Sequence, residues 1–339
     1  MSAGAGLTGA IETKNLDFLP PGARAPRAFT DAIGVRSAEG GTAVRIGLSE
    51  RVPFAVDESE DLKSITVRLH NTLVHTNWIV YSATDDFVAE VRFKQEGQDV
   101  AAVSILLEPG KTLWGYHAQF EGNALRLELR HPPRLALPPA SPLSGLKVFL
   151  DPGHTPSAPG ENIGPLGTRE MDLNFALTKA VEARLIGQGA KPLLSRNTNE
   201  DDVPLAERPR MAWDNKADLF VSIHNNNLPD GSNPFAFPHG HSTFYYHPHS
   251  MALAREIHAS YRKRVPIPDE KLRFGDLLVL RATQMPAVLT ESAYLTLPDQ
   301  EEKLLDPKFR GKVADAIVAG LRAFLEKERG KQGRRIMPK

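Results

Sequence analysis

Four residues of types that bind metal ions or move protons stand at the ends of the secondary-structure elements that the sequence predicts. His154 follows an apolar, strand-like run through an Asp-Pro-Gly turn, and His224 and Glu291 each end a further apolar run. Glu170 follows a Gly- and Pro-rich loop and opens a helical pattern. Because the carboxyl ends of parallel strands lie along one edge of a sheet, where ligands bind, we expect these four side chains to converge.

Such a set of side chains could hold zinc and hydrolyse an amide. Two neutral imidazoles and one carboxylate are a known ligand set for catalytic zinc, and they leave the fourth tetrahedral position to water. We therefore predict that His154, Glu170 and His224 hold one Zn²⁺ ion. Glu291 would then be the catalytic base, because a second carboxylate can take a proton from the activated water and give it to a leaving nitrogen.

Each of these residues also has an ordinary structural interpretation. A histidine after a strand is more often a hydrogen-bonded loop residue than a ligand, and Glu170 alone could be a charge favoured by a helix N-terminus. Glu291 is harder to explain in this way, since a carboxylate at the end of a buried strand is costly unless it is paired, metal-bound or catalytic. Asp151, in the turn before His154, is predicted to be structural.

Two His-x-His pairs offer a competing metal site. His239 with His241, and His247 with His249, flank a predicted strand at 242–246. Alternate residues on a strand share a face, so each pair could chelate an ion. Both pairs lie in Gly- and Pro-rich flanks, however, which favours a loop that exposes histidines near the site. The sequence does not decide between a metal site and such a loop for these four histidines.

The composition limits the classes of protein to which the chain can belong. Its 339 residues are enough for two domains, and a hydrophobic fraction of 41% is typical of globular proteins. The 41 basic and 41 acidic side chains cancel, so nothing favours nucleic acid or an anionic membrane as a partner. The absence of cysteine excludes disulfides and thiolate ligands.

We expect no membrane span and see no signal-peptide pattern after Met1. The sequence gives no indication of the oligomeric state.

Composition and hydrophobic periodicity divide the chain into five segments. Residues 1–34 are predicted to be a flexible leader, because they are rich in Gly, Ala and Pro without a sustained period. Residues 35–131 alternate apolar and polar side chains, which is typical of a separate all-β domain. The prolines of 132–145 indicate a stiff linker. Residues 146–328 would form the catalytic domain, and 329–339 a basic, disordered tail.

Strands and helices alternate in the predicted catalytic domain. This order indicates an α/β fold with a mostly parallel six-stranded sheet and helices on both faces. The predicted strands lie near 146–150, 191–195, 219–223, 242–246, 277–280 and 287–291, and the predicted helices near 170–187, 204–214, 250–264 and 307–327. Pro209, inside the second of these helices, is expected to kink it.

A series of short motifs in this domain resembles the zinc-dependent N-acetylmuramoyl-L-alanine amidases of the type-3 amidase family. The motifs occur in order over nearly all of 146–326, and as a set they are specific. They are Leu150–His154, the Gly-rich loop ending in Glu170, Ser195-Arg196, Leu205 with Arg208, Ala217–Asn225, Thr243–Tyr246, Val279–Arg281 and Met285–Glu291.

The resemblance implies cleavage of the amide between the lactyl group of N-acetylmuramic acid and the L-alanine of the peptidoglycan stem peptide. It assigns His154, Glu170 and His224 to zinc and Glu291 to the catalytic base. Peptidoglycan would be the partner, and the protein would act outside the cytoplasm, in the periplasm or the cell wall. The β-rich domain resembles the AMIN domains that direct such amidases to the cell wall, so we expect it to have a targeting role.

The chain departs from the family pattern in two places. The family usually has two glycines after the first histidine, whereas Thr155-Pro156-Ser157 follows here. Only 17 residues separate His224 from the predicted strand at 242. Some family members carry an inhibitory helix in this segment, so we expect this protein to act without an activating partner.

Two other functions are compatible with the same residues. A zinc carboxypeptidase-like peptidase could share the His/Glu/His set, but it would need a basic side chain to hold a substrate carboxylate, for which Arg273 and Arg281 are candidates. A non-catalytic peptidoglycan-binding protein could keep the fold, but it would have no use for a buried base such as Glu291.

Overall fold

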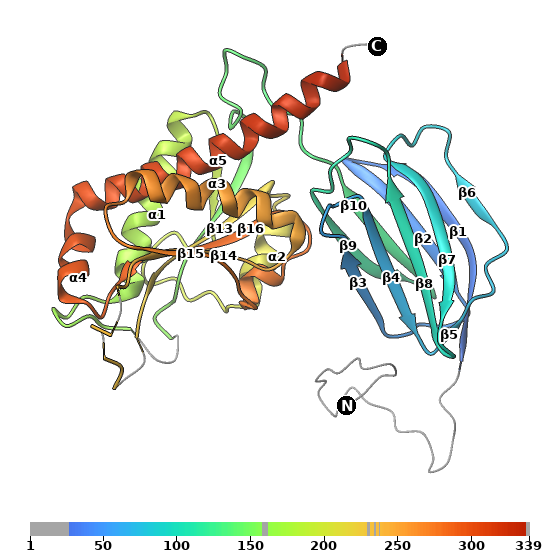
Figure 1. The fold of residues 1–339 in the computed structure, drawn as a ribbon, viewed down its shortest axis with the longest axis horizontal. Helices are drawn as coiled ribbons and strands as arrows, with labels where there is room; N and C mark the ends of the chain where they lie inside the picture. Colours follow the sequence, from blue (N-terminus) through green and yellow to red (C-terminus); the bar gives the residue numbers. More distant parts are fainter. Residues whose placement is uncertain (1–26, 158–161, 229–230, 234, 237, 337–339) are drawn as a thin grey trace. The chain divides into compact units, whose positions relative to one another are not determined.

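The computed structural model describes residues 27–157, 162–228, 231–233, 235–236 and 238–336. The chain divides into two compact units, Met1–Pro132 and Pro133–Lys339. The first unit consists of strands, whereas the second combines strands with helices (Figure 1). Each unit is described separately below.

The first unit is a β-sandwich in which two sheets enclose one apolar core. One sheet has the strand order β5-β1-β2-β10-β9, with β6 paired to β1, and the other has the order β3-β4-β8-β7. Alternate side chains of β10, Leu125, Leu127 and Leu129, are fully buried in the core that both sheets share, which is the burial expected from the period of two. The strands are β1 Ala28–Ala38, β2 Gly41–Leu48, β3 Phe54–Glu58, β4 Ser64–His70, β5 Thr72–Leu73, β6 Ile79–Tyr81, β7 Val88–Glu96, β8 Val100–Leu107, β9 Gly115–Glu121 and β10 Ala124–Arg130.

The second unit contains a six-stranded sheet with the order β12-β11-β13-β16-β14-β15. All neighbouring strands are parallel except β14 and β16, so the prediction of a mostly parallel sheet is confirmed. The strands are β11 Lys147–Pro152, β12 Lys191–Leu194, β13 Leu219–Asn226, β14 His241–Tyr245, β15 Asp269–Phe274 and β16 Ala287–Tyr294. The helices are α1 Glu170–Gly187, α2 Glu207–Asp214, α3 Pro248–Arg264, α4 Pro298–Leu305 and α5 Pro307–Ile336, with a 3₁₀ turn, η2, at Leu278–Arg281.

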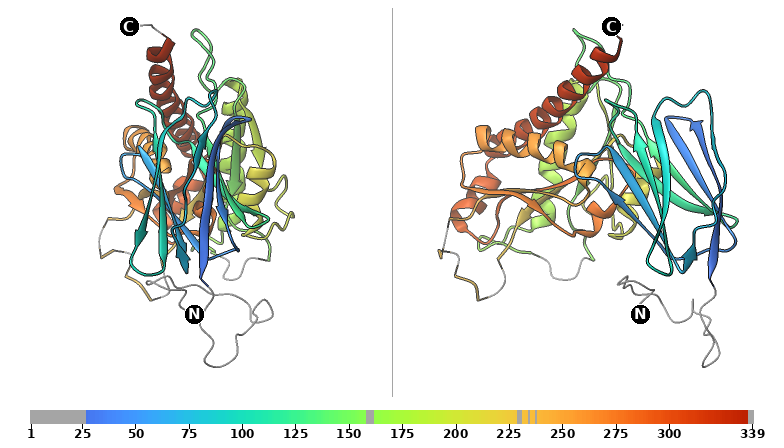
Figure 2. Two further views of the ribbon diagram at one scale, coloured as in Figure 1. Left: turned by 90° about the vertical axis from the view of Figure 1, so that its right-hand side faces the viewer. Right: turned by 45° about the vertical axis from the view of Figure 1, so that its right-hand side comes forward.

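Helices cover both faces of this sheet, as predicted. Helix α5 packs against α1 and α3, which in turn contact the strands, so these three helices form one layer (Figures 1 and 2). Ala212 of α2 belongs to a separate buried cluster with Phe149, Phe220 and Leu289, which lie on the other face of the sheet.

One predicted strand is wrong. Residues 278–280 fall in the 3₁₀ turn η2, with Leu277 directly before it, and the sixth strand is β15 instead. Among the described strands, β15 pairs only with β14 at the sheet edge, and all of its residues are exposed or half-buried. Its sequence, DEKLRF, therefore carries charges where a buried strand would carry apolar residues. Helix α4 was not predicted, because its eight residues are too few for a clear helical period.

The predicted ends of three segments also need correction. Strand β1 begins at Ala28, so the prediction of a flexible leader is wrong for 28–34, while 1–26 lie outside the described residues. Helix α5 continues to Ile336, so the predicted disordered tail is wrong up to that residue, and 337–339 lie outside the described residues. Near this end of the helix, Arg329 Nη1 donates to the carbonyl oxygens of Ala136 and Ala140, both at 3.0 Å.

The expected kink at Pro209 is absent because α2 begins at Glu207 rather than near 204. Pro209 therefore lies in the first helical turn, where the backbone N–H groups have no partner within the helix.

Candidate active site

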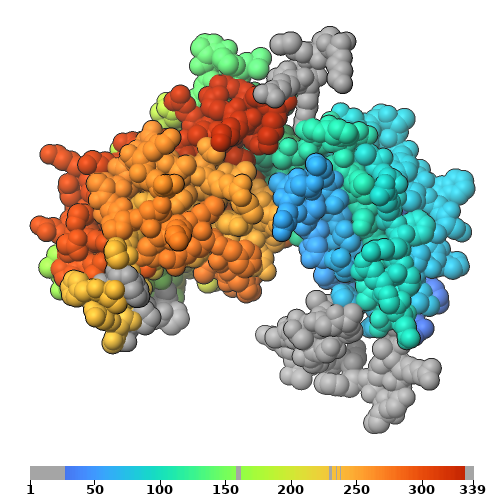
Figure 3. Space-filling model, in the orientation of Figure 1, coloured from blue at the N-terminus to red at the C-terminus, as the bar shows by residue number. Residues whose placement is uncertain are grey.

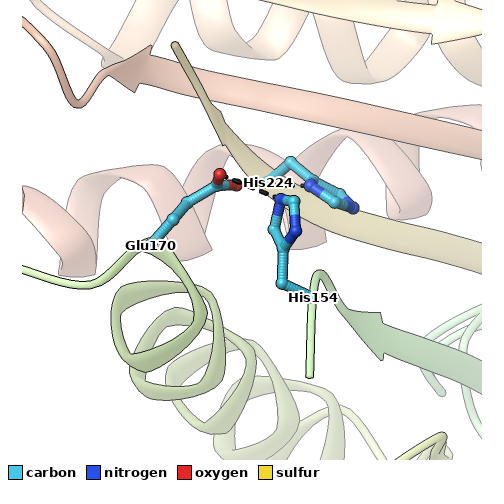
Figure 4. Close-up of side chains that lie close together, drawn as sticks. All are labelled: His154, Glu170 and His224. Carbon is cyan, nitrogen blue, oxygen red and sulfur yellow. Dashed lines mark hydrogen bonds and ion pairs between the residues drawn. The ribbon is translucent and has the colours of Figure 1, made fainter. Parts of the chain in front are cut away.

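The structure brings His154, Glu170 and His224 together at one edge of the second unit's sheet. One possible ligand atom from each lies within 4.8 Å of the others. His154 Nε2 is 2.9 Å from Glu170 Oε2, and His224 Nδ1 is 3.3 Å from Glu170 Oε1. Figure 4 shows both imidazole rings turned toward the glutamate carboxylate. Two imidazoles and one carboxylate thus converge, from segments up to 70 residues apart in the chain.

Each of the three side chains comes from the end of an element. His154 follows β11 through Gly153, Glu170 is the first residue of α1, and His224 lies near the end of β13, which pairs with β11 in parallel. His154 has a φ of 62°, a left-handed conformation that is costly for a residue with a side chain. The turn holds this conformation, and its cost is consistent with a functional constraint on His154.

Glycine is required at position 153 because the ring of His224 packs against its backbone. A Cβ atom built at this position would lie 2.2 Å from His224 Cε1, far inside van der Waals contact. Any larger residue would therefore displace His224 or the turn that carries His154.

Glu170 is held as an anion by a buried set of donors. It is 1% exposed, and three groups besides the histidines donate to it: Asn162 Nδ2 at 2.6 Å, Asn174 Nδ2 at 2.9 Å and the Asn225 backbone N–H at 3.1 Å. Burial alone would raise the pKa of Glu170, but the bonds from the histidines outweigh it and hold the pKa well below its usual range.

The three asparagines were not predicted, because an amide acquires such a role only through its position in the fold. The sequence offers two weak signals. Asn174 lies four residues after Glu170 and so on the same helix face, and Asn225 directly follows His224. Nothing in the sequence distinguishes Asn162, in the loop before α1, from other loop asparagines.

A buried arginine fixes the turn between β11 and His154. Arg196 is 1% exposed, and its guanidinium donates to the carbonyl oxygens of Pro152 at 3.4 Å, Gly153 at 3.4 Å and Met171 at 2.7 Å. Burial, followed by the nearby charge of Arg208, lowers the pKa of Arg196 to about 10, so the side chain remains charged at neutral pH. Arg196 thereby links the His154 turn to the first turn of α1.

Asp151 has the structural role that was predicted for it. It is fully buried and accepts hydrogen bonds from Ser195 Oγ at 2.7 Å, Ser222 Oγ at 2.8 Å and Arg208 Nη1 at 3.3 Å. These bonds join the ends of β11, β12 and β13 to α2. Asp151 and its three hydrogen-bond partners therefore stabilise the positions of the strand ends relative to one another.

Glu291 lies beside the three converging residues. It is the register partner of His224 in the parallel pair of β13 and β16, and it is half-buried. Its Oε2 is enclosed and has no hydrogen-bond partner in the described residues. Burial, and then the charges of Glu170 and Glu270, raise the pKa of Glu291 well above its usual value. An enclosed, unpaired carboxyl group at this edge is available to exchange a proton.

Glu270, which sequence reasoning missed, organises the groups next to Glu291. Its carboxylate accepts hydrogen bonds from the Gly240 N–H at 3.1 Å, Tyr294 Oη at 3.0 Å and Arg273 Nη2 at 2.7 Å, and it lies 3.1 Å from His239 Nδ1. Glu270 lies on the charged edge strand β15, whose sequence gave no sign of a buried contact.

The two arginines considered as holders of a substrate carboxylate are both paired with acids of the protein. Arg273 binds Glu270. Arg281 donates to both oxygens of Asp276, at 2.7 and 3.1 Å. A peptidase function would need one of these pairs to open.

Neither His-x-His pair forms a chelate among the described residues. His239 contacts Glu270, whereas His241 faces helix α3. The Nε2 atoms of His247 and His249 lie 3.1 Å and 3.3 Å from the carbonyl oxygens of Arg281 and Met285. The members of each pair are held by different partners. The expectation of a loop that exposes these histidines is wrong, because His239, His241 and His249 are buried against these partners.

The chain is similar to a known protein family and to two proteins of Bacillus subtilis. A family model described as N-acetylmuramoyl-L-alanine amidase matches residues 148–323, more than half of the chain. Uncharacterized protein YqiI of Bacillus subtilis (strain 168) is 32% identical over 55% of this chain and 88% of its own length. N-acetylmuramoyl-L-alanine amidase LytC of the same strain is 33% identical over 53% of this chain but only 36% of its own length.

A solved structure has a similar fold over about half of the chain. The crystal structure of the N-acetylmuramoyl-L-alanine amidase from Clostridium difficile 630 matches 55% of this chain and 99% of that chain, with 28% identity and a TM-score of 0.51. None of the helices in the described ranges has the length and hydrophobicity that a membrane-spanning helix requires.

Proposed function

Because the chain belongs to the N-acetylmuramoyl-L-alanine amidase family, we propose that it hydrolyses the amide between N-acetylmuramic acid and the L-alanine of the peptidoglycan stem peptide. The observation that carries this proposal is the convergence of His154, Glu170 and His224 beside Glu291 at one sheet edge. LytC, which is named for this activity, is similar over about half of this chain.

His154, Glu170 and His224 have the chemistry required to hold zinc. Their donor atoms are two imidazole nitrogens and a carboxylate oxygen, and the bonds from Asn162 and Asn174 orient the carboxylate as outer-shell partners do in metal sites. A zinc ion bound there would polarise a carbonyl oxygen and make a water molecule more acidic.

Glu291 would be the general base of the reaction. Its unpaired Oε2 can accept a proton from the attacking water, and the resulting carboxylic acid can give that proton to the leaving amine of L-alanine. The enclosed position of this carboxyl group limits competition from bulk water. The products are a glycan strand with a free lactyl carboxylate and a stem peptide with a free amino terminus.

Two substitutions separate catalysis from metal binding. Glu291→Gln keeps the size of the side chain, and it should retain zinc but lose turnover by about a hundredfold or more, the usual contribution of a general base. His224→Ala should lose both zinc and turnover. The measurements are zinc content by mass spectrometry and release of peptides from purified sacculi. A fully active Glu291→Gln variant would show that the proton is handled by another group.

The proposed substrate implies a location for the protein and a role for its first unit. Peptidoglycan lies outside the cytoplasm, so the protein would act in the periplasm or the cell wall. The β-sandwich of the first unit would then hold the enzyme on the wall, as AMIN domains do.

A further inference from the structure

A second cluster of two histidines and one carboxylate lies outside the site described above. It consists of His241 on β14, His258 on α3 and Asp269 on β15, and one possible ligand atom of each lies within 4.8 Å of the others. His241 and Asp269 are the first residues of their strands and are register partners in the parallel pair. His258 lies on helix α3, which packs against both strands. The residues of this helix belong to the orange part of the surface in Figure 3.

The cluster has the same composition and the same close contact as the first. His258 Nε2 is 2.9 Å from Asp269 Oδ1, which matches the 2.9 Å between His154 Nε2 and Glu170 Oε2. The rings of His241 and His258 are 5.5 Å apart and steeply inclined. In both clusters, therefore, a carboxylate oxygen and imidazole nitrogens from separate elements lie close together.

The buried histidines leave hydrogen-bonding capacity unused. His241 is 1% exposed and His258 is 8% exposed, yet the Nδ1 atoms of both have no hydrogen-bond partner in the described residues. Buried polar atoms in native proteins are nearly always paired, so an unpaired imidazole nitrogen at this depth requires an explanation. A salt bridge between His258 and Asp269 alone would not explain why His241 is placed beside them.

Both oxygens of the Asp269 carboxylate are held by neighbouring groups. Arg262 Nε is 3.1 Å from Oδ2, and Oδ1 accepts a hydrogen bond from the Lys271 backbone N–H at 2.7 Å while it faces His258. Outer-shell bonds of this kind fix the orientation of ligating carboxylates. The Asp269 side chain is about one-third exposed, so an ion could enter from solvent on this side.

We propose that His241, His258 and Asp269 form a second binding site for a divalent transition-metal ion of the zinc type. Imidazole and carboxylate donors suit such ions, and three protein ligands leave a position for water. The ion would join β15, whose one partner among the described strands is β14, to helix α3. It would thereby also fix Glu270, the residue after Asp269, whose carboxylate organises the groups beside Glu291.

Zinc stoichiometry of the full chain tests this site independently of the amidase activity. After loading with Zn²⁺ and removal of excess ion, the unmodified protein should hold two zinc ions per chain. Asp269→Asn, which keeps a hydrogen bond to His258, should hold one. His154→Ala should also hold one, and the double variant none. His75→Gln, which removes an exposed histidine of the first unit, should still hold two.

The melting temperature provides a second test for the case in which a substitution disturbs folding. Added Zn²⁺ should raise the melting temperature of His154→Ala but not that of His154→Ala combined with Asp269→Asn or with His258→Gln. One zinc ion in the unmodified chain and none in His154→Ala would overturn the second site while leaving the proposed function intact. Two ions that persist in both Asp269→Asn and His258→Gln would also overturn it.

Discussion

Gly153 and the ring of His224 lie so close together that one methyl group added at position 153 tests the metal centre. Gly153→Ala should weaken zinc binding by about tenfold or more, because its Cβ would meet the His224 ring at 2.2 Å and move one ligand. Zinc affinity measured by competition with a chelator checks this. Gly187→Ala at the end of α1, where a Cβ meets nothing within 4 Å, is the matched control. Equal affinities in the two variants would contradict the assignment of His224.

Asn174 tests the orientation of the carboxylate ligand. Its side chain is fully buried and donates to Glu170 Oε1 at 2.9 Å, while its oxygen accepts from Asn225 at 2.9 Å. Asn174→Ala should lower zinc affinity by about 10- to 100-fold, the range found for outer-shell partners. Asn215→Ala, at an exposed helix end, should leave the affinity unchanged. Unaltered zinc binding in Asn174→Ala would mean that Glu170 needs no such support.

At the scale of elements, α4 fixes the loop that leads to Glu170. Glu301 of α4 is fully buried, and it accepts hydrogen bonds from the backbone N–H groups of Leu166 at 2.8 Å and Thr168 at 3.1 Å. Gly164 packs so closely on this carboxylate that a Cβ would lie 2.4 Å from it. The loop conformation therefore depends on a residue 133 to 135 positions later in the chain.

Glu301→Ala should release this loop. Both amides lose their acceptor, so their hydrogen exchange should become faster by about tenfold or more, and zinc binding should weaken because Glu170 follows directly. Hydrogen exchange followed by mass spectrometry checks the first effect. The adjacent, exposed Glu302 provides the control variant Glu302→Ala. Unchanged exchange in Glu301→Ala would show that the loop is held by other contacts.

The strands that could be predicted best from the sequence are those whose residues are buried along almost their whole length. The apolar runs of β11, β13 and β16 are buried on both faces and end abruptly in polar residues, so their ends, and hence the candidate site, were visible. Strand β15 could not be predicted, because the sequence of an exposed edge strand carries charges and resembles that of a loop. The same limit applies to Glu270 and Asp269 on β15, whose partners are brought near only by the fold.

At the scale of the whole molecule, the first unit has its own core and its own proposed task. The fragment 27–132 should be retained by purified sacculi in a pull-down, because a wall-targeting domain must bind without the catalytic unit. The second unit alone, 133–339, provides the comparison, and it should be retained less. Equal recovery of the fragment with and without sacculi would remove the targeting role.

The measurement that tests the central claim most directly is product analysis of purified sacculi digested by the full chain alone. We predict release of intact stem peptides that begin with the free amino group of L-alanine, with no second protein added. Treatment with a chelator should abolish the release, and added zinc should restore it. Peptides shortened at their carboxyl ends, or undiminished release after complete removal of metal, would contradict the account.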